Sequence, residues 1–276
     1  MGKFRAYLKL SRIEHGVMTG LAVVAGYLAV NASFSLRLVL AFLSSLFAEM
    51  SLFAFNDIFN IEEDRVNSPE RPLVRGDLSR REALAFAAVA STSALLLALP
   101  LGAYPVLLLL AALAIGNAYN YYLKRLSIIG NLAVAGLTAS SFLYGALATG
   151  LAVEEKVSLF FLIAFLANIG REIAKGVRDL EGDIRVGVCT LACEIGVKQA
   201  GLVSAIFMAL AVALSLASPQ YFALKEPFVA MLALTDAMFI HSIFTIARTP
   251  TPEAAGIVRR NTLIGMLVAI LAFTLP

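Results

Sequence analysis

Carboxylate and amide side chains form two groups in this sequence, each at the end of a long apolar segment. The first group comprises Asn56, Asp57, Asn60 and Asp64, and the second comprises Asp179 and Asp183. Residues three or four positions apart share one face of a helix, so each group predicts a row of oxygen ligands along a helix. Mg2+ prefers carboxylate oxygens, water and substrate phosphate as ligands. The two groups therefore predict a site for magnesium and a diphosphate.

The side chains in these groups receive different roles. The predicted metal ligands are Asn56, Asp57, Asn60, Asp64, Asp179 and Asp183. The predicted catalytic residues are the carboxylates Asp57, Asp64, Asp179 and Asp183. Neighbouring acidic residues, such as Glu62 and Glu63, are interpreted as solvated helix ends.

Basic residues accompany both groups and suit phosphate, which Arg binds in bidentate fashion. The predicted phosphate-binding residues are Arg12, Arg65, Arg71, Lys124, Arg125, Arg171, Lys175 and Arg178. Metal and guanidinium groups together stabilise the negative charge that develops on a departing diphosphate.

Glu49 lies two turns before Asp57 on roughly the same face of the predicted helix. We predict that it orients an acceptor hydroxyl or accepts its proton. The alternative is that Glu49 forms a hydrogen bond between helices.

The elements that carry these residues are predicted to be transmembrane helices. The chain has 276 residues, of which 60% are hydrophobic and 15% are charged, and its mean hydropathy is +0.84. A soluble domain has about one quarter charged residues, so a soluble helical protein is disfavoured. The apolar segments are long enough to span a bilayer as helices of about 20 residues. They cover residues 16–30, 38–59, 83–99, 104–122, 128–149, 157–177, 201–216, 228–246 and 257–275.

The predicted fold is therefore an all-α membrane protein with nine transmembrane helices around a central cavity that is open to the cytoplasmic side. Most basic residues fall at the same ends of these helices as the acidic groups, and only Arg37, Lys156 and Lys225 fall at the other ends. The positive-inside rule makes the basic side cytoplasmic. We expect a multi-pass protein of the cell membrane with its active site facing the cytoplasm. The absence of a linker predicts one domain over residues 1–276, and nothing indicates a nucleic-acid partner.

Two cysteines, Cys189 and Cys193, lie four positions apart. They have no histidine partners at a metal-ligand spacing. We therefore expect two free thiols that pack among other side chains, and not a metal or redox pair.

The residues of the two groups resemble the motifs of the UbiA superfamily of intramembrane prenyltransferases. The first motif of the family is Asn-Asp-x-x-Asp-x-x-x-Asp, and this chain matches it from Asn56 to Asp64, with Asn60 in place of the middle Asp. The second motif, Asp-x-x-x-Asp, matches Asp179 and Asp183. The resemblance implies nine helices, a laterally open cavity for lipidic substrates, and a prenyl diphosphate bound through Mg2+ near the cytoplasmic surface.

Other stretches are similar to segments of this family and add substrate-binding residues. The run from Asp64 to Ser79 resembles the family segment Asp-Arg-x-Asn-x-Pro-x-Arg-Pro-(hydrophobic)-x-x-Gly, which adds Asn67. Tyr121, Tyr122, Lys124 and Arg125 resemble a Tyr-x-Lys-Arg element of the family, which adds Tyr121 to the predicted substrate-binding residues. The run 171–183 is most similar to the archaeal digeranylgeranylglyceryl phosphate synthases, although Gly176 stands where that branch often has Asp.

The resemblance implies Mg2+-dependent transfer of a geranylgeranyl group from a prenyl diphosphate to geranylgeranylglyceryl phosphate, in archaeal-type ether membrane lipid biosynthesis. The implied partners are the prenyl diphosphate donor, a lipidic acceptor and membrane lipids. The alternative is an aromatic acceptor such as 4-hydroxybenzoate in quinone biosynthesis; Arg71, Lys124 and Arg125 favour an acceptor that carries phosphate. A multi-pass transporter is less favoured, because transporters place their polar sites near the bilayer midplane.

Overall fold

The computed structural model describes residues 2–30, 33–185, 187–221 and 226–274, except for the side chain of Asn67. Lys225 lies outside these residues. Helices make up the secondary structure of the described part, and eight of them are long and apolar enough to cross a membrane. The predicted segment 16–30 corresponds to a shorter apolar helix of 17 residues, Ile13–Ala29. The all-α prediction is confirmed, with eight candidate spans and one shorter apolar helix.

By its internal contacts the chain divides into two compact units. The first unit comprises Met1–Tyr122 and Tyr144–Ala152. Its elements are α1 (Lys3–Ser11), α2 (Ile13–Ala29), α3 (Leu36–Phe59), α4 (Ile61–Asn67), α5 (Arg80–Ala98), η1 (Leu99–Leu101), α6 (Ala103–Tyr121) and the end of α7 (Ser127–Ala148). Within this unit α3 contacts α1, α2, α5 and α6, so it is the central helix.

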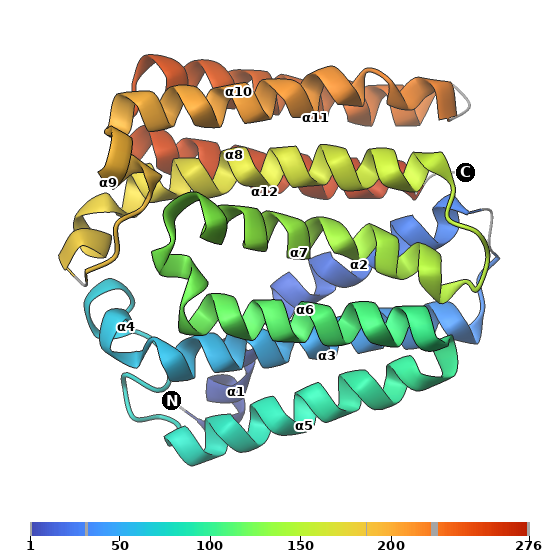
Figure 1. The fold of residues 1–276 in the computed structure, drawn as a ribbon, viewed down its shortest axis with the longest axis horizontal. Helices are drawn as coiled ribbons and strands as arrows, with labels where there is room; N and C mark the ends of the chain where they lie inside the picture. Colours follow the sequence, from blue (N-terminus) through green and yellow to red (C-terminus); the bar gives the residue numbers. More distant parts are fainter. Residues whose placement is uncertain (1, 31–32, 186, 222–225, 275–276) are drawn as a thin grey trace. The chain divides into compact units, whose positions relative to one another are not determined.

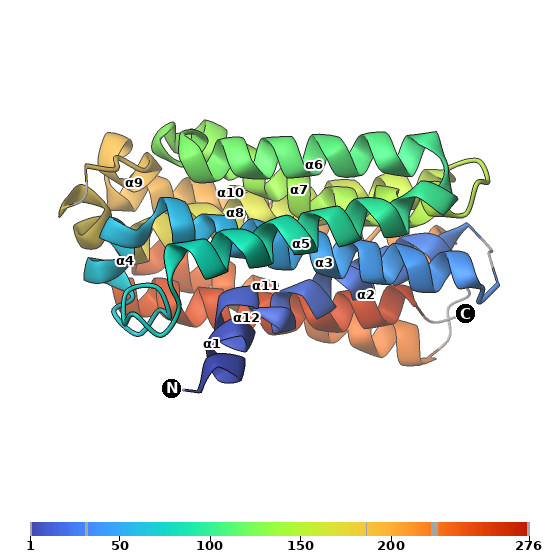
Figure 2. The ribbon, with the colours of Figure 1, turned by 90° about the horizontal axis from the view of Figure 1, so that it is seen from below.

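Small residues let the neighbours of α3 approach it closely. The buried residues of α5 are all alanines, Ala83, Ala87, Ala90, Ala94 and Ala98, and α5 runs alongside α3 (Figures 1 and 2). On the α2 side, a β-carbon at Gly16 would lie 2.6 Å from Cδ1 of Leu46. The hydroxyl of Ser44 donates to the carbonyl of Ala94 at 2.9 Å. These contacts hold α3 along its length and thereby fix the end that carries Asp57.

At the other end of α3, the Arg37 guanidinium joins two other chain segments. Its Nε donates to the carbonyl oxygen of Ala148 at 2.7 Å and its Nη2 donates to that of Leu101 at 2.5 Å. Carbonyl groups at the end of a helix lack partners within the helix. Arg37 therefore satisfies groups at the ends of α7 and η1.

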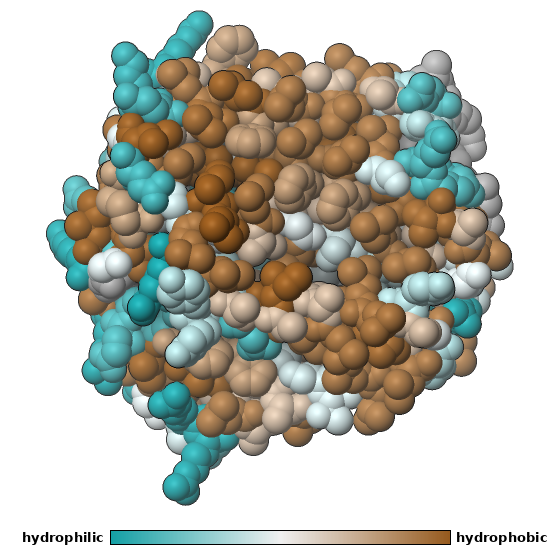
Figure 3. All heavy atoms as spheres, viewed as in Figure 1, coloured by the Kyte–Doolittle hydropathy of each residue, from teal (hydrophilic) through white to brown (hydrophobic). Residues whose placement is uncertain are grey.

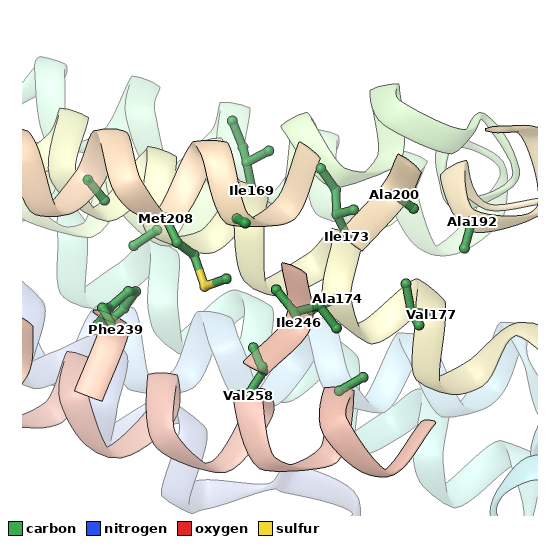
Figure 4. Close-up of a cluster of buried hydrophobic side chains, with 14 of the residues drawn as sticks. Ile169, Ile173, Ala174, Val177, Ala192, Ala200, Met208, Phe239, Ile246 and Val258 are labelled. Carbon is green, nitrogen blue, oxygen red and sulfur yellow. The ribbon is translucent and has the colours of Figure 1, made fainter. Parts of the chain in front are cut away.

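The second unit comprises Leu123–Leu143 and Val153–Pro276. It contains η2 (Leu123–Arg125), most of α7, α8 (Glu155–Arg185), α9 (Leu191–Ile195), α10 (Val197–Ser215), η3 (Ser218–Tyr221), α11 (Glu226–Arg248) and α12 (Pro252–Phe273). Helix α8 packs against α10 and α12, and α11 packs against α10 and α12 (Figure 1). The core between them includes Ile173 and Val177 of α8, Met208 of α10, Ile246 of α11 and Val258 of α12 (Figure 4).

A close contact between α8 and α10 positions the second acidic group. A β-carbon at Gly170 would lie 2.8 Å from the carbonyl oxygen of Ser204. The Ser204 hydroxyl donates to the Gly170 carbonyl at 2.7 Å. Because α8 is continuous over 31 residues, this contact also orients the later turns of α8, which carry Asp179 and Asp183.

The exposed surface of the helices is largely apolar. Only 28–50% of the residues in the apolar windows of the candidate spans are buried, and Figure 3 shows apolar side chains along the helices with polar ones mainly toward their ends. Exposed apolar residues such as Leu107 of α6 and Ile206 of α10 suit contact with lipid tails. The chain is a multi-pass membrane protein.

The prediction of two free thiols is wrong. Cys189 and Cys193 form a disulfide, with their Cα atoms 5.3 Å apart. The chain enters the short helix α9 between them, which brings residues four positions apart to within the range that a disulfide spans. Their sequence spacing indicated proximity, but it did not distinguish a disulfide from two packed thiols.

Candidate functional site

The first acidic group lies where α3 gives way to α4. Asp57 belongs to the last turn of α3, and Asn60 is both the C-cap of α3 and the N-cap of α4. The Asp64 backbone N–H donates to the Asn60 carbonyl at 2.8 Å. The side chain of Asp57 is fully buried, Asn60 is buried and Asp64 is half-buried.

Arg12 is the direct partner of Asp57. Its Nη2 donates to Oδ1 of Asp57 at 2.6 Å, and the guanidinium lies over the Phe53 ring, 4.4 Å from the centroid. Such a position over a ring is favourable for a cation. Arg12 joins α1 to α2 with φ 44° and ψ 51°, where the chain bends sharply (Figure 2). A non-glycine residue in this left-handed conformation costs about 1–3 kcal/mol, and such residues are concentrated at functional sites.

Several polar atoms around this group are buried without a hydrogen-bond partner among the described residues. They are Nε of Arg12, Oδ2 of Asp57, Oδ2 of Asp64 and Nε of Arg71. Buried polar atoms nearly always have partners, so each exception indicates a missing ligand or strain. Two carboxylate oxygens match a divalent cation, and two guanidinium N–H groups match phosphate oxygens. The residues present therefore fit a magnesium ion with a diphosphate.

Electrostatics supports the same fit. Burial and then the charge of Asp57 raise the pKa of Asp64 to about 6, against the opposing charges of Arg71 and Arg12. Burial also lowers the pKa of Arg12, against the attraction of Asp57. The first group thus holds buried charges that its own members do not fully compensate.

Asn56 is oriented by Asn120, which was not among the predicted site residues. Its Nδ2 donates to Oδ1 of Asn120 on α6 at 2.8 Å, and Nδ2 of Asn120 donates to the Leu52 carbonyl at 3.0 Å. The amide nitrogen of Asn56 is therefore engaged by protein, which leaves the amide oxygen as its group for a ligand. The signal was present: Asn117 and Asn120 are polar residues within an apolar segment, where such groups are costly.

The second acidic group lies on α8 and has a different environment. Arg178 binds the adjacent Asp179 in bidentate fashion, with Nε to Oδ1 at 2.6 Å and Nη2 to Oδ2 at 2.8 Å. Both side chains are about 30% exposed, at 28% and 31%. Asp183 lies one turn further along α8 and also has interactions within the protein. Here the carboxylates are partnered and accessible.

Two turns earlier, α8 carries an ionic cluster around the buried carboxylate of Glu172. Glu172 accepts from Arg171 at 3.0 Å and from Lys175 at 3.4 Å. The Nε of Arg171 is buried without a partner among the described residues. Arg171 therefore has one donor engaged by protein and another available to an anion.

The other predicted residues differ in how well they suit the site. Arg65 is exposed and pairs with Glu62 at 2.8 Å, so the structure does not bring it to the buried atoms. Tyr121 is exposed at the end of α6 and contacts the Phe59 ring, with centroids 6.0 Å apart. Lys124 is half-buried and Arg125 is exposed, both in η2. Within the described part of the chain, no three His, Cys, Asp or Glu side chains gather as a ligand set.

The chain matches a known protein family over most of its length. The model of the UbiA prenyltransferase family matches residues 17–271. Several archaeal proteins of similar length match nearly the whole chain, and all are digeranylgeranylglyceryl phosphate synthases. The protein from Archaeoglobus fulgidus is 34% identical, over 99% of this chain and 97% of its own. That from Pyrococcus abyssi is 33% identical, over 98% and 96% of the two chains.

Solved structures share the fold. A structure described as giving insights into digeranylgeranylglyceryl phosphate synthase in membranes is 30% identical and superposes with a TM-score of 0.79, covering 99% of this chain and 98% of the other. A UbiA homologue from Archaeoglobus fulgidus bound to DMAPP and Mg2+ has a TM-score of 0.73 at 20% identity, covering 98% and 99% of the two chains. The resemblance read from the motifs is confirmed.

Proposed function

Because this chain belongs to the UbiA prenyltransferase family, we propose that it transfers a geranylgeranyl group from geranylgeranyl diphosphate to geranylgeranylglyceryl phosphate. The product is digeranylgeranylglyceryl phosphate, a precursor of ether membrane lipids. Relatives with this activity in their names match essentially the whole chain at 32–34% identity. They support neither the aromatic acceptor nor the transporter considered above.

The observation that carries the proposal is the set of buried, unpartnered atoms on Asp57, Asp64, Arg12 and Arg71. Asp57 and Asp64 would hold Mg2+, with the amide oxygens of Asn56 and Asn60 completing their side of the ligand set. We assign Asp179 and Asp183 to metal as well, with the free lone pairs of the Asp179 carboxylate, or its release by Arg178, providing the ligand. Bound Mg2+ neutralises charge on the diphosphate as it becomes the leaving group.

Arg12 and Arg71 would donate to the phosphate oxygens. Transfer breaks the bond between the first prenyl carbon and the diphosphate oxygen, so negative charge grows on the diphosphate and positive charge on the prenyl carbon. Fixed donors stabilise this change without having to reorganise during the reaction. The apolar helices bury the prenyl chain and keep water from the carbon.

The acceptor brings a second phosphate, which requires further cations. Arg171 and Lys175 on α8, with Lys124 and Arg125 in η2, are our candidates. Tyr121 and Asn67 are assigned to substrate binding on the family motif alone.

We further infer that the chain works as one domain. Its site would open to the cytoplasmic side and admit lipidic substrates from the bilayer. The gathering of basic residues near both acidic groups supports this orientation.

The test uses purified protein with Mg2+, geranylgeranyl diphosphate and a panel of acceptors, and identifies the products by mass. We expect digeranylgeranylglyceryl phosphate from the glycerol phosphate acceptor, none from 4-hydroxybenzoate, and none when Mg2+ is chelated. A prenylated 4-hydroxybenzoate without the lipid product would overturn the assigned acceptor. Failure with every acceptor would overturn the assigned activity.

A further inference from the structure

Glu49 is a carboxylate inside a membrane-length helix. It lies on α3 eight residues before Asp57, about 12 Å along the helix at 1.5 Å per residue. Ionisable residues within transmembrane segments are rare, and most face the protein interior for a functional reason.

The neighbours of Glu49 show which way it faces. Leu46, three residues before it, lies against Gly16 of α2. Phe53, four residues after it, packs against the ring of His15 with centroids 5.1 Å apart. Residues three and four apart share a helix face, so Glu49 faces the first turns of α2, beside Arg12. The charge of Arg12 acts on both Glu49 and Asp57.

Glu49 is half-buried and differs in its partners from two other carboxylates on spanning helices. Glu172 of α8 accepts from Arg171 and Lys175, and Asp236 of α11 accepts from the Ser215 hydroxyl at 2.8 Å. No described residue forms a hydrogen bond or ion pair with Glu49. An unpartnered carboxylate in an apolar setting is costly to keep, so packing alone does not account for it.

The proposed reaction needs a group of this kind. As the glycerol hydroxyl oxygen bonds to the first prenyl carbon, its O–H bond must break and the proton must go to a base. In the proposed site, the carboxylates near the diphosphate would be engaged by Mg2+ and, for Asp57, by Arg12. The separation along α3 between Asp57 and Glu49 leaves room for a diphosphate, its first carbon and a hydroxyl oxygen about 3 Å beyond that carbon.

We propose that Glu49 is a catalytic residue that accepts the proton of the glycerol hydroxyl as the new C–O bond forms. This assignment rests on the proposed function, since it requires a hydroxyl acceptor. The electron pair of the broken C–O bond leaves with the diphosphate, the hydroxyl oxygen supplies the pair for the new bond, and Glu49 takes the proton.

The test compares Glu49→Gln, which keeps the shape but cannot take the proton, with Glu49→Asp and with Asp236→Asn as a matched intramembrane control. Turnover, the KM for each substrate and Mg2+-dependent binding of geranylgeranyl diphosphate are measured for each. We expect Glu49→Gln to lower kcat about 100-fold or more, in the range of general base catalysis. Its KM values and donor binding should stay within about threefold of wild type, Glu49→Asp should retain more activity than Glu49→Gln, and Asp236→Asn should be near wild type.

The outcomes separate the two proposals. If wild type makes no lipid product, the proposed function fails. If wild type is active and Glu49→Gln keeps kcat within threefold, the base assignment fails while the function stands. Loss of donor binding in both Glu49 variants would overturn the assignment in favour of a structural role.

Discussion

The two acidic groups share residue types and spacing but differ in their surroundings. In the first group, Asp57 is buried, with one oxygen on Arg12 and the other without a partner among the described residues. In the second, Asp179 is partly exposed and both of its oxygens are bound by Arg178. Buried groups are held in place before a ligand arrives, whereas exposed pairs exchange readily with water and ions. We infer that the first group is the preorganised part of the diphosphate site.

The largest expected effect comes from the buried carboxylate. Asp57→Asn should lower turnover by about 1000-fold or more, since it removes a charge from the metal and leaves Arg12 without its partner. Asp179→Asn should lower it by about 100-fold, because water can replace a partly exposed ligand. Product formation at saturating Mg2+ measures both. Equal losses of turnover in the two variants would contradict the inference that the first group alone is preorganised.

Arg12 should have the next largest effect. Arg12→Lys keeps a positive charge but loses the planar, multi-donor group, so we expect kcat/KM for the prenyl diphosphate to fall about 10- to 100-fold. The KM for the acceptor should change little. An equal rise in both KM values would show that the residue shapes the whole site and does not act on the donor alone.

Asp64 offers a test on stability. Its pKa is raised to about 6 from 3.8, so the folded state holds the proton more tightly and the ionised form destabilises it above pH 6. One pKa unit corresponds to about 1.4 kcal/mol, and partial exposure reduces the effect. We expect Asp64→Asn, without Mg2+, to be about 1–2 kcal/mol more stable at pH 8. The gain should shrink as the pH falls through 6 toward 4, which thermal unfolding in detergent would follow.

Arg65 should give the smallest effect. It is exposed and its partner Glu62 is 74% exposed, and such pairs contribute little. Arg65→Ala should change kcat/KM less than about threefold, whereas Arg71→Ala, which removes a buried Nε–H, should lower it at least tenfold. A large loss of activity in Arg65→Ala would show that Arg65 binds substrate, as the family motif predicts, in spite of its exposed position.

Hydropathy predicted the helices well, because the bilayer demands long apolar segments whatever their partners. It made the sixth segment, 157–177, too short. That segment ends where the apolar residues end, but α8 continues to Arg185, because the last turns of a helix need apolar residues on one face only. Asp57 and Asp64 were recognisable from spacing.

Side-chain partners were not predictable from the sequence. The hydrogen bond between Asn56 and Asn120 joins residues 64 positions apart, and the Arg178 pairing depends on rotamers. The left-handed turn at Arg12 also follows from tertiary contacts. The spacing of residues along the sequence does not specify these side-chain pairings, because they form only when the helices pack.

The hydrogen bonds of Arg37 have a consequence for biogenesis. Leu101 lies 64 residues after Arg37, and Ala148 lies 111 residues after it. A ribosome adds residues from the N-terminus onward, so α3 is made long before the carbonyl of Ala148 exists. The Arg37 Nε–H therefore has no partner at Ala148 until α7 has been made, whereas the Leu101 carbonyl is available earlier. The hydrogen bond that joins the start of α3 to the end of α7 therefore forms late, because the order of synthesis makes Ala148 last.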